Sequence, residues 1–476
     1  MSKFSWSAAL VGVLCLLPQL ALAEGGHHPH IPGAELSALW AVPFACMLLS
    51  IAIFPLTMPH LWEHHFGKIS VFWGLAFLVP CALFYGWQTA LYEFLHIMLL
   101  DYVSFIILLF ALFTVAGGVR LKGTLVGTPV VNTGILAVGT VLASWMGTTG
   151  AAMLLIRPLL RANAHRRYRV HSIVFFIFLV ANIGGSLTPL GDPPLFLGFL
   201  KGVSFFWTTQ HLFLKTLFMA VLLLALFFVL DTVLYGKERK PVPRVDPNAP
   251  QEKLGLEGTV NLLLLLGIVA AVLLSGLFPM GTLVSIYGVE LETQNVLRDL
   301  VLLLIAWLSW KLTDTECRDL NDFSWAPIEE VAKLFLGIFV SMIPAIAILK
   351  AGTKGALAPL ISMVSQNGEP VNSMYFWLTG MLSSFLDNAP TYLVFFNTAG
   401  GNASELMTTH AMTLAAISAG AVFMGANSYI GNAPNFMVRS IAEEQGVPMP
   451  SFFGYMMWSF GILVPLFAVL TWVFFL

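Results

Sequence analysis

Charged residues are scarce in this chain, since lysine, arginine, aspartate and glutamate together make up only 10% of its 476 residues. Soluble globular domains contain roughly 25% charged residues. Hydrophobic residues, by contrast, account for 58% of the chain. The composition therefore excludes an ordinary soluble domain and predicts an all-α polytopic membrane protein.

Several motifs are also absent. The sequence contains no Gly-x-x-x-x-Gly-Lys-[Ser/Thr] loop, which argues against an ATP-driven pump. It has no hydrolase or metalloprotease motif and no feature typical of nucleic-acid binding, so we expect neither an enzyme nor an organic cofactor. The four cysteines (Cys15, Cys46, Cys81 and Cys317) show neither disulfide nor metal spacing.

The first residues resemble a secretory signal. Lys3 precedes an apolar run, and Ala21-Leu22-Ala23 is an A-x-A cleavage pattern. We therefore predict that residues 1–23 are a cleaved signal peptide, with an uncleaved first span as the alternative. Cleavage would place the mature N-terminus on the outer face.

Hydropathy predicts ten membrane spans. They are 36–57, 69–88, 101–119, 171–203, 212–235, 257–277, 296–311, 330–350, 408–440 and 452–476. With the N-terminus outside, the arginines between 161 and 169 and the basic, proline-rich linker 236–256 both fall inside, as the positive-inside rule requires. We therefore expect a multi-pass protein of a bacterial inner membrane, embedded in the lipid bilayer.

Two further apolar segments do not fit as ordinary spans. Residues 131–160 are interrupted by Ser144-Trp-Met-Gly-Thr-Thr-Gly150, and residues 374–401 by Ser384-Phe-Leu-Asp-Asn-Ala-Pro-Thr391. About thirty residues are too few for two crossings of roughly 20 residues each. Both segments are therefore predicted to be re-entrant hairpins, the first entering from inside and the second from outside.

Two of the spans carry helix-breaking residues in the middle. Asn182-Ile-Gly-Gly-Ser-Leu-Thr-Pro-Leu-Gly-Asp-Pro-Pro194 interrupts 171–203, and Gly425-Ala-Asn-Ser-Tyr-Ile-Gly-Asn-Ala-Pro434 interrupts 408–440. Glycine and proline disfavour a continuous helix, and open backbone inside a bilayer is tolerated only where protein buries it or where it lines a wet cavity. Both spans are therefore predicted to be broken helices, with a proline-kinked structural helix as the alternative for the first.

One constant offset of 240 residues relates the two halves. It carries Ser144 onto Ser384, Gly185 onto Gly425 and Asp192 onto Asn432. Because one hairpin opens inside and the other outside, the sequence predicts an inverted-repeat secondary transporter with its site at the repeat interface. The predicted divisions are an outer tail with two leading helices (24–100), a first repeat (101–235), a cytoplasmic linker (236–256) and a second repeat (257–476).

The chemistry expected at the interruptions is cation binding. Asp192 and Asp387 are the only acids there, and an isolated carboxylate in a low-dielectric site tends to take up a proton or a cation. Each could instead cap the helix that follows it. Hard oxygen ligands of the kind that sodium favours, or groups that could bind a substrate, lie nearby: Thr148, Thr149, Asn182, Ser186, Thr188, Gly191, Asn388, Thr391, Asn427, Ser428, Asn432 and Asn435. We therefore predict that Asp192 and Asp387 carry cations or protons and that sodium binds in their regions.

Other charged residues lie near the ends of predicted spans. These are Asp101, Asp231, Glu329, Glu330 and Lys350. Long or polar side chains at such positions usually reach the membrane interface. We therefore expect them to be solvated rather than functional.

The motifs Asn182-Ile-Gly-Gly-Ser-Leu-Thr-Pro-Leu-Gly-Asp192 and Ser384-Phe-Leu-Asp-Asn388 resemble those of the ion transporter superfamily. Within it they are most similar to NhaD-type sodium/proton antiporters and to the citrate transporter group related to them. The resemblance covers roughly residues 100–476. It implies that Gly191-Asp192 and Asp387-Asn388 take part in ion exchange, and by analogy with related folds it also implies a homodimer.

Two departures from these relatives keep the cargo open. NhaD-type antiporters tend to have threonines after the glycine-aspartate pair, where this chain has Pro193-Pro194. Dicarboxylate transporters carry Ser-Asn-Thr at both hairpin tips, where this chain has Gly147-Thr148-Thr149 and Asp387-Asn388-Ala389. The absence of arginine and lysine from the tips favours sodium/proton antiport, with cation-coupled transport of a citrate-like carboxylate as the alternative.

Overall fold

The computed structural model describes residues 30–238, 253–366 and 368–476. The signal peptide predicted for residues 1–23 and most of the predicted linker lie outside these ranges. Within them, eight helices are long and apolar enough to cross a membrane. The prediction of an all-α polytopic membrane protein is confirmed.

Two groups of helices, which we call the flanking helices, frame the molecule. The first group comprises η1 (Ala38–Ala41), α2 (Val42–Thr57), α3 (Pro59–Tyr85), α4 (Trp87–Ile97), η2 (Met98–Tyr102) and α5 (Val103–Ala116). The second comprises α11 (Val260–Leu277), α12 (Thr293–Leu312), the short α13 (Thr315–Asp319) and α14 (Ala326–Lys350). The two groups pack against each other: α5 of the first contacts α11 and α12, and α14 of the second contacts α2 and α3.

Two helical hairpins form at the predicted positions. Hairpin 1 consists of α6 (Pro129–Met146) and α7 (Thr148–Ala162), and hairpin 2 of α16 (Asn372–Phe385) and α17 (Asn388–Thr398). Gly147 turns the chain between α6 and α7 with a φ of 82°, a conformation that glycine adopts without steric cost. The depth of the hairpins in a bilayer, and hence their re-entrant character, stays a prediction.

Both predicted broken helices are interrupted in the structure. The first consists of α8 (Val170–Leu179), η3 (Ile183–Ser186) and α9 (Pro193–Leu200). The second consists of α19 (Ala411–Met424), η5 (Gly425–Asn427) and α20 (Ala433–Glu444). Each second half begins with proline in its first turn, where a missing N–H costs nothing.

The remaining elements close the two halves and connect the helices. A long helix follows each interrupted one, α10 (Trp207–Lys237) in the first half and α21 (Phe452–Phe474) in the second. Short helices connect the second half: η4 (Gly352–Lys354), α15 (Ala358–Val364) and α18 (Ala403–Met407). Three two-stranded antiparallel ladders join β1 (Arg120–Lys122) to β2 (Gly255–Glu257), β3 (Thr282–Ile286) to β4 (Val289–Glu292), and β5 (Ser365–Gln366) to β6 (Glu369–Pro370).

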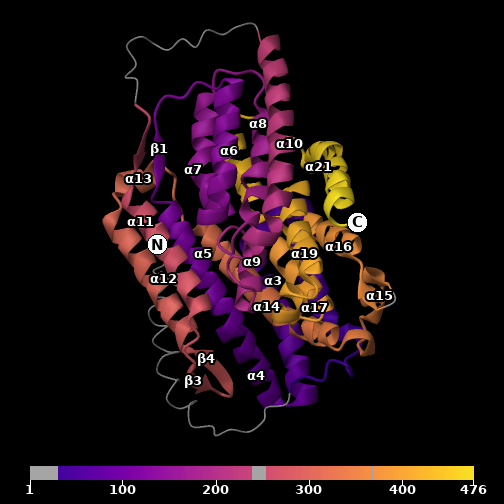
Figure 1. Ribbon diagram of the computed structural model, residues 1–476. Helices are drawn as coiled ribbons and strands as arrows, with labels where there is room; N and C mark the ends of the chain where they lie inside the picture. The colour runs from indigo at the N-terminus through magenta and orange to yellow at the C-terminus, as the bar shows by residue number, and fades with distance from the viewer. Residues whose placement is uncertain (1–29, 239–252, 367) are drawn as a thin grey trace.

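The hairpins open toward opposite ends of the molecule, as Figure 1 shows. At the open end of hairpin 1, Asn132 hydrogen-bonds to Asp231 near the C-terminal end of α10. Beyond hairpin 2, the carbonyl of Met407 accepts from Trp207 at the start of α10. We call the end that carries Arg166 and Lys237 the basic end.

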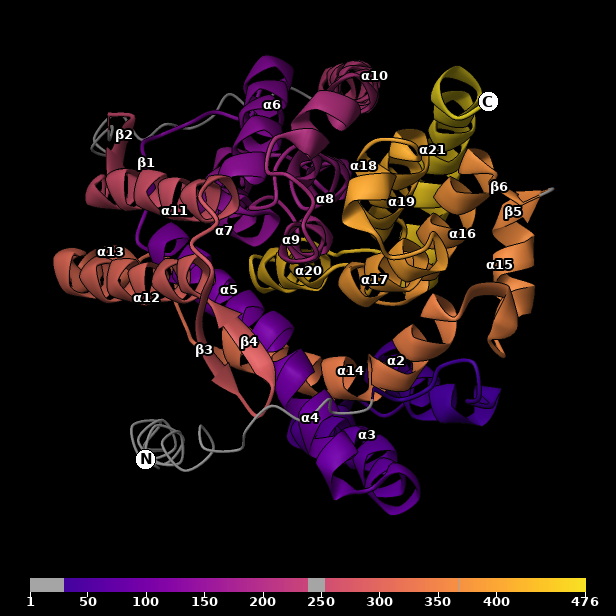
Figure 2. The same ribbon diagram turned by 60° about the horizontal axis from the view of Figure 1, so that its bottom comes forward.

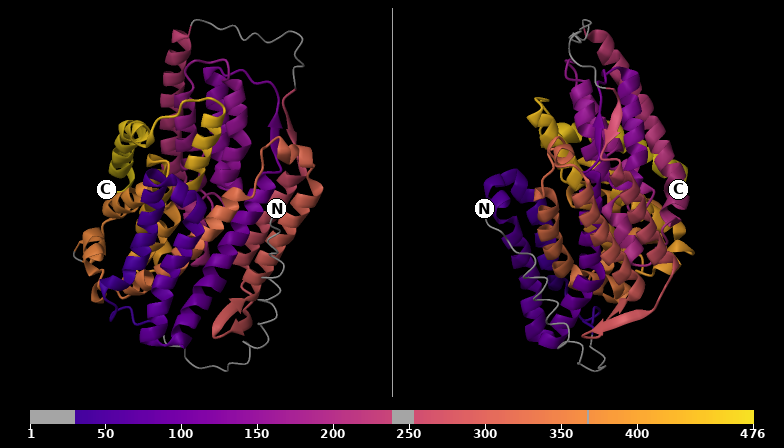
Figure 3. Two further views of the ribbon diagram at one scale, coloured as in Figure 1. Left: turned by 180° about the vertical axis from the view of Figure 1, so that it is seen from behind. Right: turned by 90° about the vertical axis from the view of Figure 1, so that its left-hand side faces the viewer.

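The hairpins and interrupted helices lie together on one side of the flanking helices. Figure 2 shows α9 and α20 close together at the centre, and α2, α3 and α14 to one side of them. In the right-hand view of Figure 3, the indigo helices α2, α3 and α4 form a flank beside the lower half of the molecule. This arrangement leaves the two interruptions facing the flanking helices.

Two predicted spans begin earlier than hydropathy indicated. The helix expected at 69–88 starts at Pro59, because the polar turn around His60 and His64 continues into it. The helix expected at 101–119 starts at Trp87 and runs through the π-helical segment η2 into α5. In both cases packing between neighbouring helices outweighs the low hydropathy of the first turns.

The expectation that Asp101 and Asp231 reach solvent is wrong. Asp101 is buried and accepts from the Lys201 ammonium with both carboxylate oxygens, at 2.7 and 2.6 Å. Asp231 is buried within hydrogen-bonding distance of Arg166, His171 and Asn132. Each acid has a basic partner from a distant segment, Lys201 in the turn after α9 and Arg166 in the loop between α7 and α8, so burial leaves no isolated charge.

Candidate functional site

The side chain of Asp192 lies where the tips of both hairpins meet the breaks of both interrupted helices. Its Oδ1 accepts hydrogen bonds from the Thr148 hydroxyl and from Asn432 Nδ2, both at 3.0 Å. Its Oδ2 accepts from Asn388 Nδ2 at 2.5 Å. These three donors come from hairpin 1, the second interrupted helix and hairpin 2, and Asp192 itself is only 1% exposed. The carboxylate thus joins both halves of the chain at one buried point.

Asp192 occupies the N-cap position of α9, yet its side chain makes no capping hydrogen bond. Its oxygens point instead to the three donors from other elements. The capping alternative considered for this residue therefore does not describe its side chain.

The glycines that frame Asp192 are required by close backbone contact. A Cβ at Gly191 would lie 2.1 Å from the carbonyl oxygen of Gly185. The same relationship holds 240 residues later, where a Cβ at Gly431 would lie 2.5 Å from the oxygen of Gly425. Each interruption therefore closes into a compact loop that only glycine permits.

The hydrogen bonds between hairpins and interrupted helices also repeat at the offset of 240. Ser144 Oγ donates to the carbonyl of Gly184 at 2.5 Å, and Ser384 Oγ donates to that of Met424 at 3.2 Å. The Thr188 hydroxyl donates to the carbonyl of Ser144, as the Ser428 hydroxyl does to that of Ser384. Thr188 and Ser428 thus attach each loop to its hairpin.

Three asparagines connect the two interruptions directly. Asn182 Nδ2 donates to Asn435 Oδ1 at 2.7 Å, and Asn432 Nδ2 lies 3.3 Å from Asn182 Oδ1. Asn435 in turn donates to the carbonyls of Gly425 and Ser428. This buried amide network holds the two loops against each other beside Asp192.

Asp387 differs from Asp192 in its bonding. It is the N-cap of α17, and its Oδ1 accepts from the backbone N–H of Ala389 at 3.0 Å. Its backbone carbonyl accepts from the Thr391 hydroxyl at 2.9 Å. Asp387 therefore caps the outgoing arm of hairpin 2 while its side chain borders the cavity described below.

Some predicted site residues lie away from Asp192. The Ser186 hydroxyl is 2.6 Å from that of Thr216 on α10, so it faces α10. Asn427 Nδ2 donates to Ser384 at 2.9 Å, within its own half. Thr149, by contrast, lines the same cavity as Thr148 and Asp192. Roles in ion transport for these residues stay predictions.

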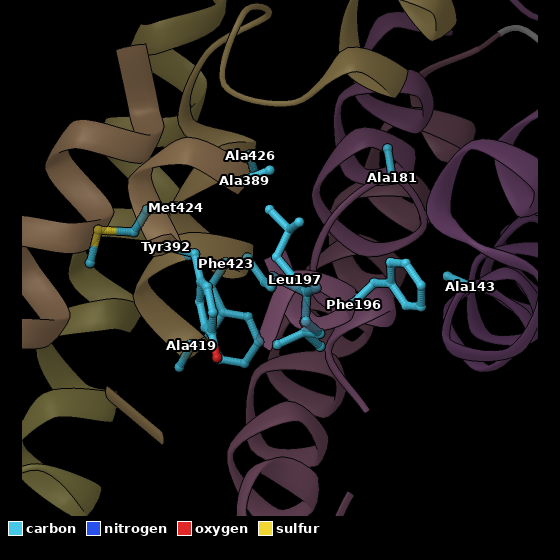
Figure 4. Packing of buried hydrophobic residues seen from close by; sticks show 14 of the residues in the cluster. Ala143, Ala181, Phe196, Leu197, Ala389, Tyr392, Ala419, Phe423, Met424 and Ala426 are labelled. Atoms are coloured by element: carbon cyan, nitrogen blue, oxygen red, sulfur yellow. The ribbon is translucent and has the colours of Figure 1, made fainter. Parts of the chain in front are cut away.

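Packing around the interruptions joins the halves through small residues. Figure 4 shows Leu197 of α9 on the side of Tyr392 and Phe423, which belong to α17 and α19, and Phe196 directed toward Ala143 of α6. The buried alanines Ala389 and Ala419 lie at the same junction. Small residues let helices approach closely, so the loops are held by a close-packed core.

A cavity of about 690 Å³ lies between this core and the flanking helices. At one end its lining includes Thr148, Asp192 and Asp387. Toward the basic end it reaches exposed residues such as Glu63 and Glu444. Its volume falls within the usual range of small-molecule sites, roughly 300–1,000 Å³.

The cavity wall carries charged residues in addition to the predicted Asp192 and Asp387. Its acidic residues are Glu63, Asp192, Asp322, Glu330, Asp387 and Glu444, and Arg157 is the one basic residue among the described residues that line it. Arg157 follows Thr149 and Met153 at steps of four along α7, and this helical spacing could have placed it on the same face. The acids of the flanking helices carried no such signal.

Comparison with known families supplies a classification. A sequence profile of a family described as putative citrate transport matches residues 33–475. The chain belongs to this family. Comparison with curated proteins gave no match. The profile match supports the citrate transporter group of the resemblance noted above, and not the NhaD-type antiporters specifically.

Family membership and the apolar helices together identify a multi-pass membrane protein of a transport family. Membership in this family suggests a transporter rather than an enzyme. The two buried helix breaks, which hydrogen bonds connect, and the adjoining cavity are the part of the structure where a cargo and a coupling ion could be held.

Proposed function

We propose that this protein is a secondary active transporter of a bacterial inner membrane that carries a citrate-like carboxylate together with cations. The observation that carries the proposal is the convergence of both hairpins and both interrupted helices on Asp192, at the end of a cavity large enough for a small molecule. In a family of citrate transport, that cavity is the natural place for the carboxylate.

Helix ends near Asp192 favour an anion in this place. Asp192 and its three hydrogen-bond donors each lie at the start of a helix. The four helices begin at Thr148, Pro193, Asn388 and Ala433. Helix N-termini carry a partial positive charge, although α9, which begins with Pro193-Pro194, offers no N–H at its first two positions. These ends can hold a carboxylate, provided that the charge of Asp192 is balanced.

The coupling cation supplies that balance. An anionic cargo would be repelled by the six carboxylates of the cavity unless cations accompany it. We assign sodium to this role because the groups near Asp192 are hard oxygen ligands. The Oδ1 atom of Asn388 is buried and has no hydrogen-bond partner, as expected for an atom that a cation would coordinate.

Sodium/proton antiport is the second candidate. The excess of six acids over one arginine in the cavity favours a cationic cargo, and Asp192 and Asp387 would then alternate between proton and sodium. This reading needs no carboxylate at all, and this difference separates the two candidates.

Transport by the purified protein in proteoliposomes tests the proposal. Accumulation of labelled citrate that requires an inward sodium gradient supports carboxylate transport. Collapse of a preset proton gradient by a sodium pulse, in the absence of any organic anion, would instead support antiport. Protein-free liposomes provide the baseline for both measurements.

A further inference from the structure

Arg157 lies on the cavity wall, on the outgoing arm of hairpin 1. Thr149, Met153 and Arg157 follow one another at steps of four residues and line the same cavity. Eight residues along a helix span about 12 Å. Arg157 is therefore placed between the tip at Thr148 and the basic end.

The guanidinium of Arg157 is only partly satisfied. Its Nε donates to Oδ2 of Asp322 at 3.1 Å. Its Nη1 is buried and has no hydrogen-bond partner. A buried guanidinium N–H without an acceptor is costly, so this atom is suited to an acceptor that arrives with a ligand.

Asp322 is a weakly held partner for this arginine. The Asp322 side chain is 72% exposed, whereas that of Arg157 is 13% exposed. Ion pairs that reach solvent contribute little, typically below about 1 kcal/mol. A carboxylate that enters the cavity can therefore compete with Asp322 for the guanidinium.

We propose that Arg157 binds a carboxylate group of the cargo, and that Asp322 holds the guanidinium in place when no cargo is present. The inference rests on the proposed transport of a citrate-like carboxylate. The planar fork of arginine matches a carboxylate with two parallel N–H donors. Arg157 thus supplies the positive charge that the tips of the hairpins lack.

If the cargo displaces Asp322 from Arg157, substitutions of these two residues should change the affinity for citrate in opposite directions. Arg157→Gln removes the anion anchor and should weaken citrate binding by about 10- to 100-fold. Asp322→Asn removes the competitor and should tighten it by about two- to five-fold. Asparagine also suits the left-handed backbone of Asp322, whose φ is 47°.

Two further variants sharpen the comparison. Arg157→Lys keeps the charge but loses the fork, so it should retain part of the affinity. Arg161→Gln, one turn further along α7 and outside the set of cavity-lining residues, is the matched control and should bind citrate as the unmodified protein does.

The test is citrate binding by isothermal titration calorimetry with the purified full chain in detergent and sodium, with thermal unfolding recorded for each variant. Loss in Arg157→Gln together with gain in Asp322→Asn supports the proposal. Equal weakening in both variants would show a structural ion pair and overturn it. If Arg157→Gln does not fold, Asp322→Asn decides, since weaker or unchanged binding overturns the assignment.

The unmodified protein separates this inference from the proposed function. If it binds citrate and Arg157→Gln binds equally well, the assignment of Arg157 fails while carboxylate transport stands. If it binds neither citrate nor another small di- or tricarboxylate, both fail together.

Discussion

Asn388 at the tip of hairpin 2 donates a 2.5 Å hydrogen bond to Asp192, although the two residues lie 196 positions apart. This contact places the second half of the chain directly on the acid of the first. Any movement that separates the hairpin from the interrupted helix must break it. Protonation of Asp192, or the cation binding proposed for it, would therefore alter a contact between the two halves.

Asp192→Asn should remove sodium-driven citrate accumulation. An amide in this position carries no charge and presents N–H groups to donors that need an acceptor. Three hydrogen bonds to a charged group are disturbed, so we expect a loss of about 100-fold or more in the initial rate. Labelled citrate uptake in proteoliposomes measures it, and uptake within threefold of the unmodified protein would contradict the role of Asp192.

Asp387→Asn tests the second acid with its structural role preserved. Asparagine caps helices about as well as aspartate, so the bond to the Ala389 N–H and the unfolding temperature should be retained. If Asp387 carries a cation, the sodium dependence of transport should still change. Intact transport in both aspartate variants would exclude either acid as a carrier.

Thr148→Val should raise the sodium concentration needed for half-maximal transport by about tenfold. The hydroxyl of Thr148 orients Asp192, and a hydrogen bond to a charged group contributes about 1.5–3 kcal/mol. Thr133→Val is the matched control, because Thr133 lies on the incoming arm of the same hairpin, outside the set of cavity-lining residues, and its hydroxyl donates to the carbonyl of Pro129 in its own helix. Equal shifts in the two variants would argue against this orientation by Thr148.

Gly191→Ala should destabilise the protein by at least about 1–3 kcal/mol, because its Cβ would meet a backbone oxygen that cannot move aside. Gly134→Ala is the control: nothing lies within 4 Å of a Cβ there, so it should stabilise α6 by up to about 1 kcal/mol. Thermal unfolding in detergent compares them. A Gly191 variant that melts no lower than the unmodified protein would show that the loop relaxes.

Asp231→Asn should destabilise the basic end by about 3–5 kcal/mol, since it breaks a buried ion pair with Arg166. Glu443→Gln removes an acid of similar charge from an exposed pair with Arg439 and should cost less than about 1 kcal/mol. Unfolding temperatures of the two variants give the comparison. Similar losses would mean that the buried network contributes little.

Much of the architecture could be predicted from local patterns. Helix breakers at 182–194 and 425–434 mark the interruptions, and the offset of 240 pairs residues whose hydrogen bonds repeat at that spacing, such as Thr188 with Ser428. Helix breakers act within short stretches of chain, and the repeat is visible when two such stretches are compared. Periodicity and propensity in the sequence are therefore enough to predict both features.

Contacts between distant segments could not be predicted in this way. Nothing in the local sequence shows that Asn388 and Asn432 both donate to Asp192, or that Asp101 meets Lys201. The role proposed for Arg157 on the cavity wall depends on Asp322, which belongs to a loop of the other half. Tertiary packing determines these partners, and helical spacing gives only the face on which each residue lies.

Simultaneous uptake of labelled sodium and labelled citrate into the same proteoliposomes tests the proposed coupling most directly. We expect both to enter in a fixed ratio, each requiring the other, with Asp192→Asn abolishing the joint uptake. Sodium that crosses in exchange for protons and independently of citrate, with no accumulation of citrate, would contradict carboxylate transport and establish antiport instead.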